Sequence, residues 1–263
     1  VIGVKSKMEY KKYAIIPYNL HIIKTDKFKT VSIRINFRRP IKKEEITVRN
    51  FLSAILLDST ANYPNNRFLS IEMENLYGLS LSNSNNRIGN YSVTSFDVSF
   101  LNEKYTEVGM FEKSLGLFLE VLFNPNIVDN KFDSQSFKIV KNNVEAEIKS
   151  IKDNMTKYSL IRMLEEMDEK IPTSYRGYGY LEDLAIIDED MLYKYYQTMI
   201  RSDLVEIFVL GNVDFDNMKH LLTTKIKINT IKKNILPVII EHKRIRRGIK
   251  KIIEKEELAQ SKL

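Results

Sequence analysis

The N-terminal part of the chain alternates between apolar and polar residues. Within residues 30–38, Val, Ile and Phe alternate with Ser, Arg and Asn. A period of two puts the apolar side chains on one face of a β-strand. A strand is also predicted over residues 19–25, with a turn at residues 27–29, and Pro40 ends the second strand. We therefore expect two consecutive strands, of which the second buries one face.

Apolar residues spaced three or four apart predict helices further along the chain. The predicted helices cover residues 44–57, 67–77, 106–123, 133–169, 188–199 and 215–223. Gly78 and the pair Asn124-Pro125 are typical helix ends. The longest predicted helix carries an apolar seam, which consists of Phe137, Val140, Val144, Ile148, Ile151, Met155 and Tyr158.

Three further strands complete the predicted pattern, over residues 79–83, 91–102 and 204–210. Residues 83–90, rich in Asn and Ser, are interpreted as a polar hairpin connection. Strands and helices follow one another in blocks. Such an order is typical of an α+β fold, a mainly antiparallel sheet with helices packed on one face. We assign residues 1–226 to this domain.

Composition narrows the class of protein. The chain of 263 residues contains no cysteine, which excludes disulfides and thiolate metal sites and fits a reducing compartment. No apolar run approaches the roughly 20 residues that a membrane span requires. The first residues lack the apolar core of a signal peptide. A cytoplasmic protein without a membrane span is therefore expected.

Basic charge is concentrated near the C-terminal end. Residues 219–263 hold 13 of the 41 Lys and Arg residues but only 4 of the 34 Asp and Glu residues. A solvated basic linker over residues 227–255 is the simpler interpretation, because the segment has no aromatic side chain on which a base could stack. The alternative is a basic binding module for nucleic acid, acting through residues 243–251, whose binding would fall steeply with salt.

The residues that could carry chemistry are few. The three histidines, His21, His220 and His242, are each more than a helical turn from the others, whereas a catalytic zinc usually needs three protein ligands. We expect His21 to be an ordinary sheet residue. Neither a Gly-x-Ser-x-Gly motif nor a complete Gly-rich phosphate loop is present. Glu145 and Glu147 lie on the longest predicted helix, where exposed ion pairs are their expected role.

Several segments, in their order and spacing, resemble the insulinase (pitrilysin) metallopeptidases. One is Glu-Asn-Leu-Tyr-Gly at residues 74–78, which ends a short helix. Phe-Asn-Pro at residues 123–125 precedes the long helix, which carries Glu-Ala-Glu-Ile at residues 145–148. Gly-Tyr-Leu-Glu-Asp-Leu at residues 179–184 and Phe-Val-Leu-Gly-Asn-Val-Asp at residues 208–214 follow. The resemblance implies half of a metallohydrolase of the LuxS and mitochondrial-processing-peptidase type.

The zinc motif of that family is degenerate here. Its members hold zinc with His-x-x-Glu-His and with a further glutamate on a later helix. The resemblance places the two histidine positions at Asn50 and Ala54, the water-activating position at Ser53, and the third ligand at Glu147. Only Glu147 keeps its chemistry, and one carboxylate cannot hold a catalytic zinc. No cofactor of this chain is therefore expected, and zinc is expected only in a catalytic partner.

These departures make the chain similar to the non-catalytic, YmfF-like bacterial subgroup of the family. Membership implies a subunit that forms a chamber with a catalytic insulinase-type partner and helps to bind unfolded peptide. An exposed strand edge would pair with the peptide backbone, and the strand carrying Ser80, Ser82 and Ser84 is the expected one. The resemblance also implies that residues 256–263 begin a truncated second homologous domain. Exposed edges make a homodimer of the chain a further expectation.

An active zinc peptidase with relocated ligands is the alternative within the same family. It requires His21 or His220 to approach Glu147 in space.

Overall fold

The computed structural model describes residues 8–167, 171–226 and 228 of the chain. They contain a six-stranded sheet in the order β1-β2-β8-β3-β5-β4. Its strands are β1 (Glu9–Ile15), β2 (Tyr18–Lys24), β3 (Thr30–Pro40), β4 (Ser80–Ile88), β5 (Tyr91–Leu101) and β8 (Leu204–Gly211). Neighbouring strands are antiparallel except β2 and β8, which are parallel. The predicted α+β class is confirmed.

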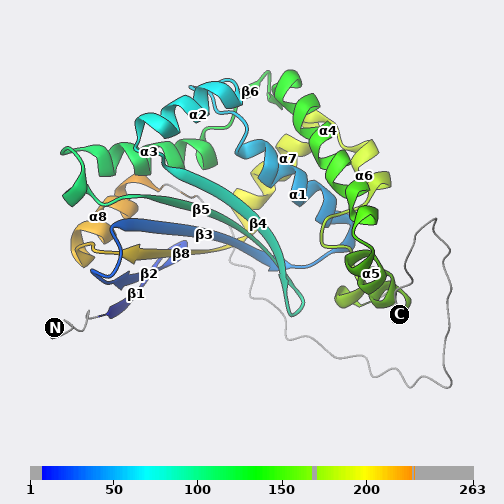
Figure 1. The fold of residues 1–263 in the computed structure, drawn as a ribbon, viewed down its shortest axis with the longest axis horizontal. Helices are drawn as coiled ribbons and strands as arrows, with labels where there is room; N and C mark the ends of the chain where they lie inside the picture. The colour runs from blue at the N-terminus through cyan, green and yellow to red at the C-terminus, as the bar shows by residue number, and fades with distance from the viewer. Residues whose placement is uncertain (1–7, 168–170, 227, 229–263) are drawn as a thin grey trace.

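The helices lie over one face of this sheet (Figure 1). They are α1 (Ile46–Leu56), α2 (Asn66–Asn75), α3 (Met110–Phe123), α4 (Ser134–Ser150), α5 (Met155–Met167), α6 (Leu181–Ile186), α7 (Glu189–Ser202) and α8 (Phe215–Lys225). A small hairpin of β6 (Ile127–Val128) and β7 (Lys131–Phe132) precedes α4. One continuous core fills the space between the helices and the sheet, and it extends between α1 and α4, where Phe51 packs on Phe137.

The alternation predicted for β3 is confirmed. Its four apolar side chains are fully buried against the helices, whereas Arg34 on the other face is exposed and pairs with Asp97 of β5 at 2.6 Å. On α1, apolar side chains that include Phe51, Leu52 and Ile55 are buried in the same core. Helix α1 therefore lies against the sheet, and it is buried on almost every side, polar residues such as Thr47, Arg49 and Ser53 included.

The prediction of one continuous helix over residues 133–169 is wrong, because the helix is interrupted. Helix α4 ends at Ser150, a single 3₁₀ turn covers Ile151–Asp153, and α5 begins at Met155. Asn154 leaves the helical conformation (φ −105°, ψ 89°), and its side chain accepts a hydrogen bond from the backbone N–H of Lys157. Asn154 thus caps the second helix, a role that asparagine takes readily in place of a position inside a helix. The spacing of apolar residues does not reveal such a cap.

The interpretation of residues 83–90 as a hairpin connection is also wrong. Strand β4 continues to Ile88, and Gly89 and Asn90 alone form the turn to β5. Polar side chains of this stretch, such as Asn85, form hydrogen bonds to neighbouring side chains while they are part of a strand. A composition rich in Asn and Ser does not distinguish such a strand from a turn. Strand β1 was not predicted, because its polar side chains are mostly exposed and leave little apolar signal.

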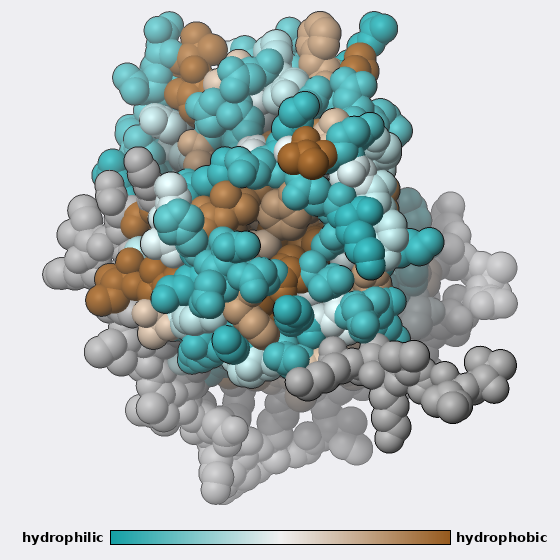
Figure 2. Space-filling view, turned by 90° about the vertical axis from the view of Figure 1, so that its left-hand side faces the viewer, coloured by the Kyte–Doolittle hydropathy of each residue, from teal (hydrophilic) through white to brown (hydrophobic). Residues whose placement is uncertain are grey.

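One end of the molecule exposes apolar side chains around the turn between β2 and β3. Phe28, Tyr105 and Val108 are all exposed there, and Tyr77 is held close by a 2.5 Å hydrogen bond to Glu107. Viewed from this end, hydrophobic side chains gather between hydrophilic ones (Figure 2). In the described ranges no helix combines the length and apolar character needed to cross a membrane.

The predicted linker over residues 227–255 lies outside the described residues, apart from Ile228. The same holds for residues 256–263, assigned to a second domain, and for residues 243–251 of the nucleic-acid alternative. The domain boundaries therefore stay predictions.

Candidate functional site

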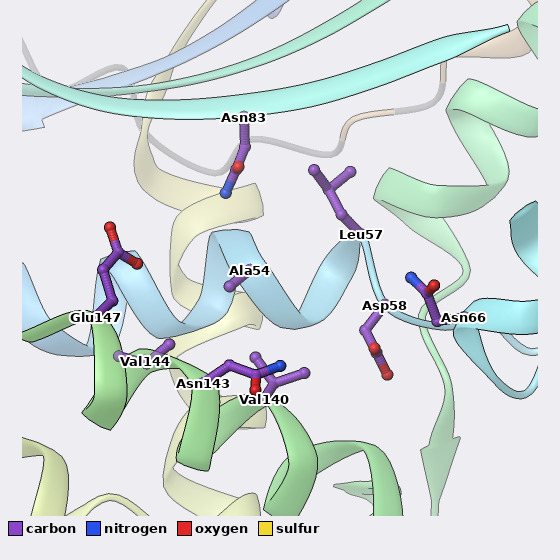
Figure 3. Close-up of a pocket in the computed structure, with 9 residues that line it drawn as sticks. All are labelled: Ala54, Leu57, Asp58, Asn66, Asn83, Val140, Asn143, Val144 and Glu147. Carbon is purple, nitrogen blue, oxygen red and sulfur yellow. The ribbon is translucent and has the colours of Figure 1, made fainter. Parts of the chain in front are cut away.

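A cavity of about 310 Å³ lies between β4 and α4, with α1 as its floor (Figure 3). Helix α1 contacts both β4 and α4. We call this cavity the groove. Its lining residues are Ala54, Leu57, Asp58, Asn66, Asn83, Val140, Asn143, Val144 and Glu147. Two positions of the degenerate zinc motif, Ala54 and Glu147, are among them, so the groove occupies the place where the resemblance puts the metal.

Asn50 and Ser53 are committed to hydrogen bonds within the fold. Asn50 Nδ2 donates to the backbone carbonyl of Gly177 at 2.7 Å, which holds the loop before α6 against α1. Ser53 is 1% exposed, and its Oγ donates to the carbonyl of Asn50 at 2.9 Å. Ala54 has no donor or acceptor in its side chain. None of the three therefore presents a free ligand or base to the groove.

A chain of hydrogen bonds connects Ser53 to a buried ion pair. Asn85 Nδ2 donates to Ser53 Oγ at 2.7 Å, and Thr94 Oγ1 donates to Asn85 Oδ1 at 2.6 Å. Arg49 Nε donates to Thr94 Oγ1 at 2.7 Å. Arg49 Nη2 donates in turn to Asp203 Oδ2 at 2.6 Å. These contacts join α1 to the edge strand β4 and to the start of β8, so the floor and one wall of the groove are held together.

The ion pair itself is a structural element. Burial by itself would lower the pKa of Arg49, but attraction to Asp203 and Tyr195 raises it above its usual value. Burial raises the pKa of Asp203, and Arg49 opposes that effect. Burial also raises the pKa of Tyr195 to about 12. With the side chains of Arg49 and Asp203 at 2% and 0% exposed, the ion pair is out of contact with solvent.

The groove carries two carboxylates without basic partners. Glu147 is exposed and Asp58 half-buried, and neither forms an ion pair with any residue in the described part of the chain. Burial raises the pKa of Asp58, the hydrogen bond from Ser136 lowers it, and the nearby charge of Asp133 raises it. Among the residues that the structure describes, no Lys, Arg or His lines the groove. Its electrostatic character is therefore acidic.

The residues at the groove do not fit a zinc ion. A catalytic zinc site needs about three ligands from His, Cys, Asp or Glu side chains around one point. Glu147 is the only motif position that still offers one, and no cluster of three or more His, Asp or Glu residues suited to a metal occurs in residues 8–167, 171–226 and 228. We derive no chemical step through zinc in this chain.

The two described histidines, His21 and His220, are not brought to Glu147. His21 lies on β2, on the face of the sheet opposite the helices; its ring stacks on Phe208, and its Nδ1 is 2.8 Å from Tyr10 Oη. Its place as a sheet residue is confirmed. His220 is exposed on α8, and His242 lies outside the described residues. The alternative with relocated ligands thus has no support from the placement of His21 or His220.

Strand β4 has a free edge. It is the last strand of the sheet, and no described residue pairs with its outer side. Gly89, with φ 61°, is the first central residue of a two-residue turn, whose flanking residues exchange both hydrogen bonds. Because hydrogen-bonded pairs alternate along an antiparallel ladder, the outward backbone groups belong to Leu81, Asn83, Asn85 and Arg87.

The predicted serines lie on the other set of positions. Ser80, Ser82 and Ser84 pair with Ser99, Asp97 and Ser95 of β5. By the same alternation, their side chains are on the face away from the helices, whereas Asn83 points into the groove (Figure 3). The sequence signal that could have found Asn83 and Asn85 is the period of two that they share with Leu81. Asp58, Asn66 and Asn143 carry no comparable signal.

Comparison with known proteins identifies similar chains. No protein-family model matches the sequence. A Bacillus subtilis (strain 168) protein described as "Probable inactive metalloprotease YmfF" is 30% identical over 245 residues, which are 92% of this chain and 57% of that protein. The chain thus spans little more than half the length of this relative.

Solved structures share the fold. A conserved protein from Enterococcus faecalis V583 matches with a TM-score of 0.78 and 27% identity, over 83% of this chain and 52% of that one. A peptidase M16 inactive domain from Pseudomonas fluorescens matches with a TM-score of 0.69 and 16% identity, over 89% and 53%. At 16% identity the second match bears on the fold alone.

Proposed function

We propose that this chain, which belongs to the insulinase (pitrilysin) family of metallopeptidases and resembles its YmfF-like subgroup, is a non-catalytic subunit that binds extended peptide beside a catalytic partner. The observation that carries the proposal is the groove. The scaffold around it is intact, but Asn50 and Ser53 are bound within the fold and Ala54 lacks a ligand atom.

Peptide binding would use the free edge of β4. An extended peptide adds a strand there by pairing with the outward N–H and C=O groups, which demands little of its sequence. The proposal is supported by the position of that edge directly beside the groove. Alternate side chains of the added strand would point into the groove, and the others toward the opposite face of the sheet.

The catalytic partner would supply the zinc. This chain covers about half the length of the relatives it matches, and a partner with a complete His-x-x-Glu-His motif would close a chamber around the bound peptide. Affinity capture of the chain from its native proteome should therefore recover an insulinase-type relative with that motif. The cytoplasmic location, the homodimer of the chain and the absence of a cofactor stay predictions.

Metal analysis tests the non-catalytic role. After equilibration with zinc and removal of excess metal, the chain is expected to hold far less than one zinc and to leave an unstructured fluorogenic peptide uncut. The double variant Asn50→His/Ala54→His serves as the positive control, since it would restore a His₂Glu set with Glu147. Stoichiometric zinc in the unmodified chain, with cleavage that Glu147→Gln abolishes, would overturn the proposal.

Backbone methylation of the peptide tests strand addition. A peptide bound along β4 donates N–H groups from every second residue, so N-methylation at those positions should weaken binding about tenfold or more. Methylation at the intervening positions should change it little. If N-methylation weakened binding without alternating between successive peptide positions, strand addition would be contradicted.

A further inference from the structure

The lining of the groove beside β4 combines apolar side chains with side chains that carry oxygen atoms. Ala54, Leu57, Val140 and Val144 provide an apolar floor and wall. Oxygen atoms lie around this surface, on the carboxylates of Asp58 and Glu147 and on the side-chain amides of Asn66, Asn83 and Asn143. A ligand that suits such a lining has an apolar stem and hydrogen-bond donors at its end.

The negative charges of Asp58 and Glu147 are not neutralised by a basic residue among those described. Glu145, on the same helix as Glu147, pairs with Lys149, whereas Glu147 and Asp58 pair with no basic residue among those described. Lys141, also on α4, donates to the carbonyl of Ile187 at 2.7 Å and so is engaged on another side of the helix. Burial raises the pKa of Asp58, the hydrogen bond with Ser136 lowers it and Asp133 raises it, and no basic residue is among these causes.

The position of the groove fixes what could enter it. Asn83 has its backbone groups at the free edge of β4 and its side chain in the groove (Figure 3). A strand added to this edge lies about 4.8 Å beyond β4, over α1 and toward α4. One of its side chains on the helix-covered face then projects between Asn83 and Glu147.

We propose that the groove is a specificity pocket for one Lys or Arg side chain of the peptide that adds to β4. The inference rests on the proposed function, since the peptide strand delivers the side chain. Glu147 and Asp58 lie at opposite ends of the groove, on either side of Ala54 (Figure 3). The methylene stem covers the apolar surface between them, and the cationic head reaches the carboxylate at one end. The pocket thus adds a preference for a basic residue to a backbone interaction that has none of its own.

The test uses fluorescein-labelled extended peptides and the full chain. Each pair of peptides differs at one position, which carries Lys in one and norleucine, with a similar stem and no charge, in the other. The substituted position is moved along the peptide. At one position, or at positions two apart, the Lys peptide should bind about tenfold more tightly by fluorescence anisotropy, as expected for one charge-assisted hydrogen bond.

Variants assign the preference to the groove. Asp58→Asn/Glu147→Gln should remove the difference between Lys and norleucine and leave the affinity for the norleucine peptide within about twofold. Glu145→Gln is the matched control, because it removes an exposed carboxylate of α4 that does not line the groove, and it should keep the preference. Circular dichroism checks that the variants are folded.

Two outcomes would overturn the inference, and they are distinguishable. Equal binding of the Lys and norleucine peptides at every position, or a preference that survives the double variant, removes the pocket and leaves strand addition in place. Failure of every peptide to bind removes the proposed peptide binding and the pocket together.

Discussion

At the scale of single residues, the type of side chain at a site is visible in the sequence, but its partner is not. The resemblance singles out Ser53 because a glutamate is missing there. In the structure Ser53 accepts a hydrogen bond from Asn85, a residue that composition had assigned to a turn. Arg49 belongs to no motif, yet it is one of the largest fully buried side chains. Its partner Asp203 lies 154 positions away in the sequence but 2.6 Å away in space. Such pairs depend on the completed sheet, and no local pattern contains them.

Ser53→Ala should destabilise the fold, because it leaves the amide of Asn85 without its buried acceptor. The expected loss of unfolding free energy is about 1–2 kcal/mol, measured by urea denaturation. Ser134→Ala, an exposed position at the start of α4, is the control and should change stability by less than about 0.5 kcal/mol. Equal effects of the two substitutions would show that the contact between α1 and β4 does not depend on Ser53.

His21 should make stability depend on pH. Burial lowers its pKa, Lys12 acts in the same direction, and Glu206 opposes them; Tyr10 and Phe208 are its ring neighbours. Near pH 6.5 the imidazole of His21 is therefore protonated to a smaller extent in the folded chain than in the unfolded chain. Stability is therefore expected to fall as the pH falls below about 6.5 and through the lower pKa of the folded state.

Urea denaturation of the unmodified chain and of His21→Phe between pH 7.5 and 5 measures this contribution. The variant should lose less stability over that range than the unmodified chain. His220→Gln, at an exposed position of α8, is the control and should behave like the unmodified chain. A His21→Phe variant with the same pH dependence as the unmodified chain would count against the role of His21.

At the scale of elements, periodicity located the helices and strands that bury apolar faces. It failed where polar side chains decide the local structure. The seam of the long predicted helix continues from Ile148 to Ile151 and Met155, so the pattern gives no sign of the break that Asn154 makes. Strand β1 shows the opposite limitation, since it pairs fully with β2 but buries little.

Asn154→Ala tests the cause of the break. The substitution removes the cap of α5 and should cost about 1 kcal/mol of unfolding free energy. Asp153→Ala, the exposed neighbour in the same 3₁₀ turn, is the matched control and should cost less than half as much. A larger loss of unfolding free energy for Asp153→Ala than for Asn154→Ala would show that the Asn154 cap does not cause the break between the two helices.

At the scale of the whole molecule, the order of strands in the sheet could not be predicted. The sequence places β8 last among the strands of the sheet, yet β8 lies between β2 and β3 and contacts both. The α+β class and the packing of the helices on one face of the sheet followed from the block order of elements. Which strands become neighbours depends on the long-range pairing of the completed core.

Truncations test whether the central strand β8 contributes more to stability than the edge strand β1. A chain that ends at Asp203 lacks β8 and α8, separates β2 from β3, and should lose cooperative unfolding in urea. A chain that begins at Tyr18 lacks only the exposed β1 and should unfold cooperatively at a lower urea concentration than the full chain. The reverse order of damage would contradict the central role of β8.

The position of β8 also governs how the protein can assemble as it is synthesised. Strands β2 and β3 leave the ribosome close together, joined by a short turn, but in the finished sheet they must stay apart until β8 lies between them. Native contacts of such large sequence separation form late and slow folding. A nascent chain that has not reached residue 204 therefore presents two unsatisfied strand edges, and these are the surfaces on which premature pairing and chaperone binding compete.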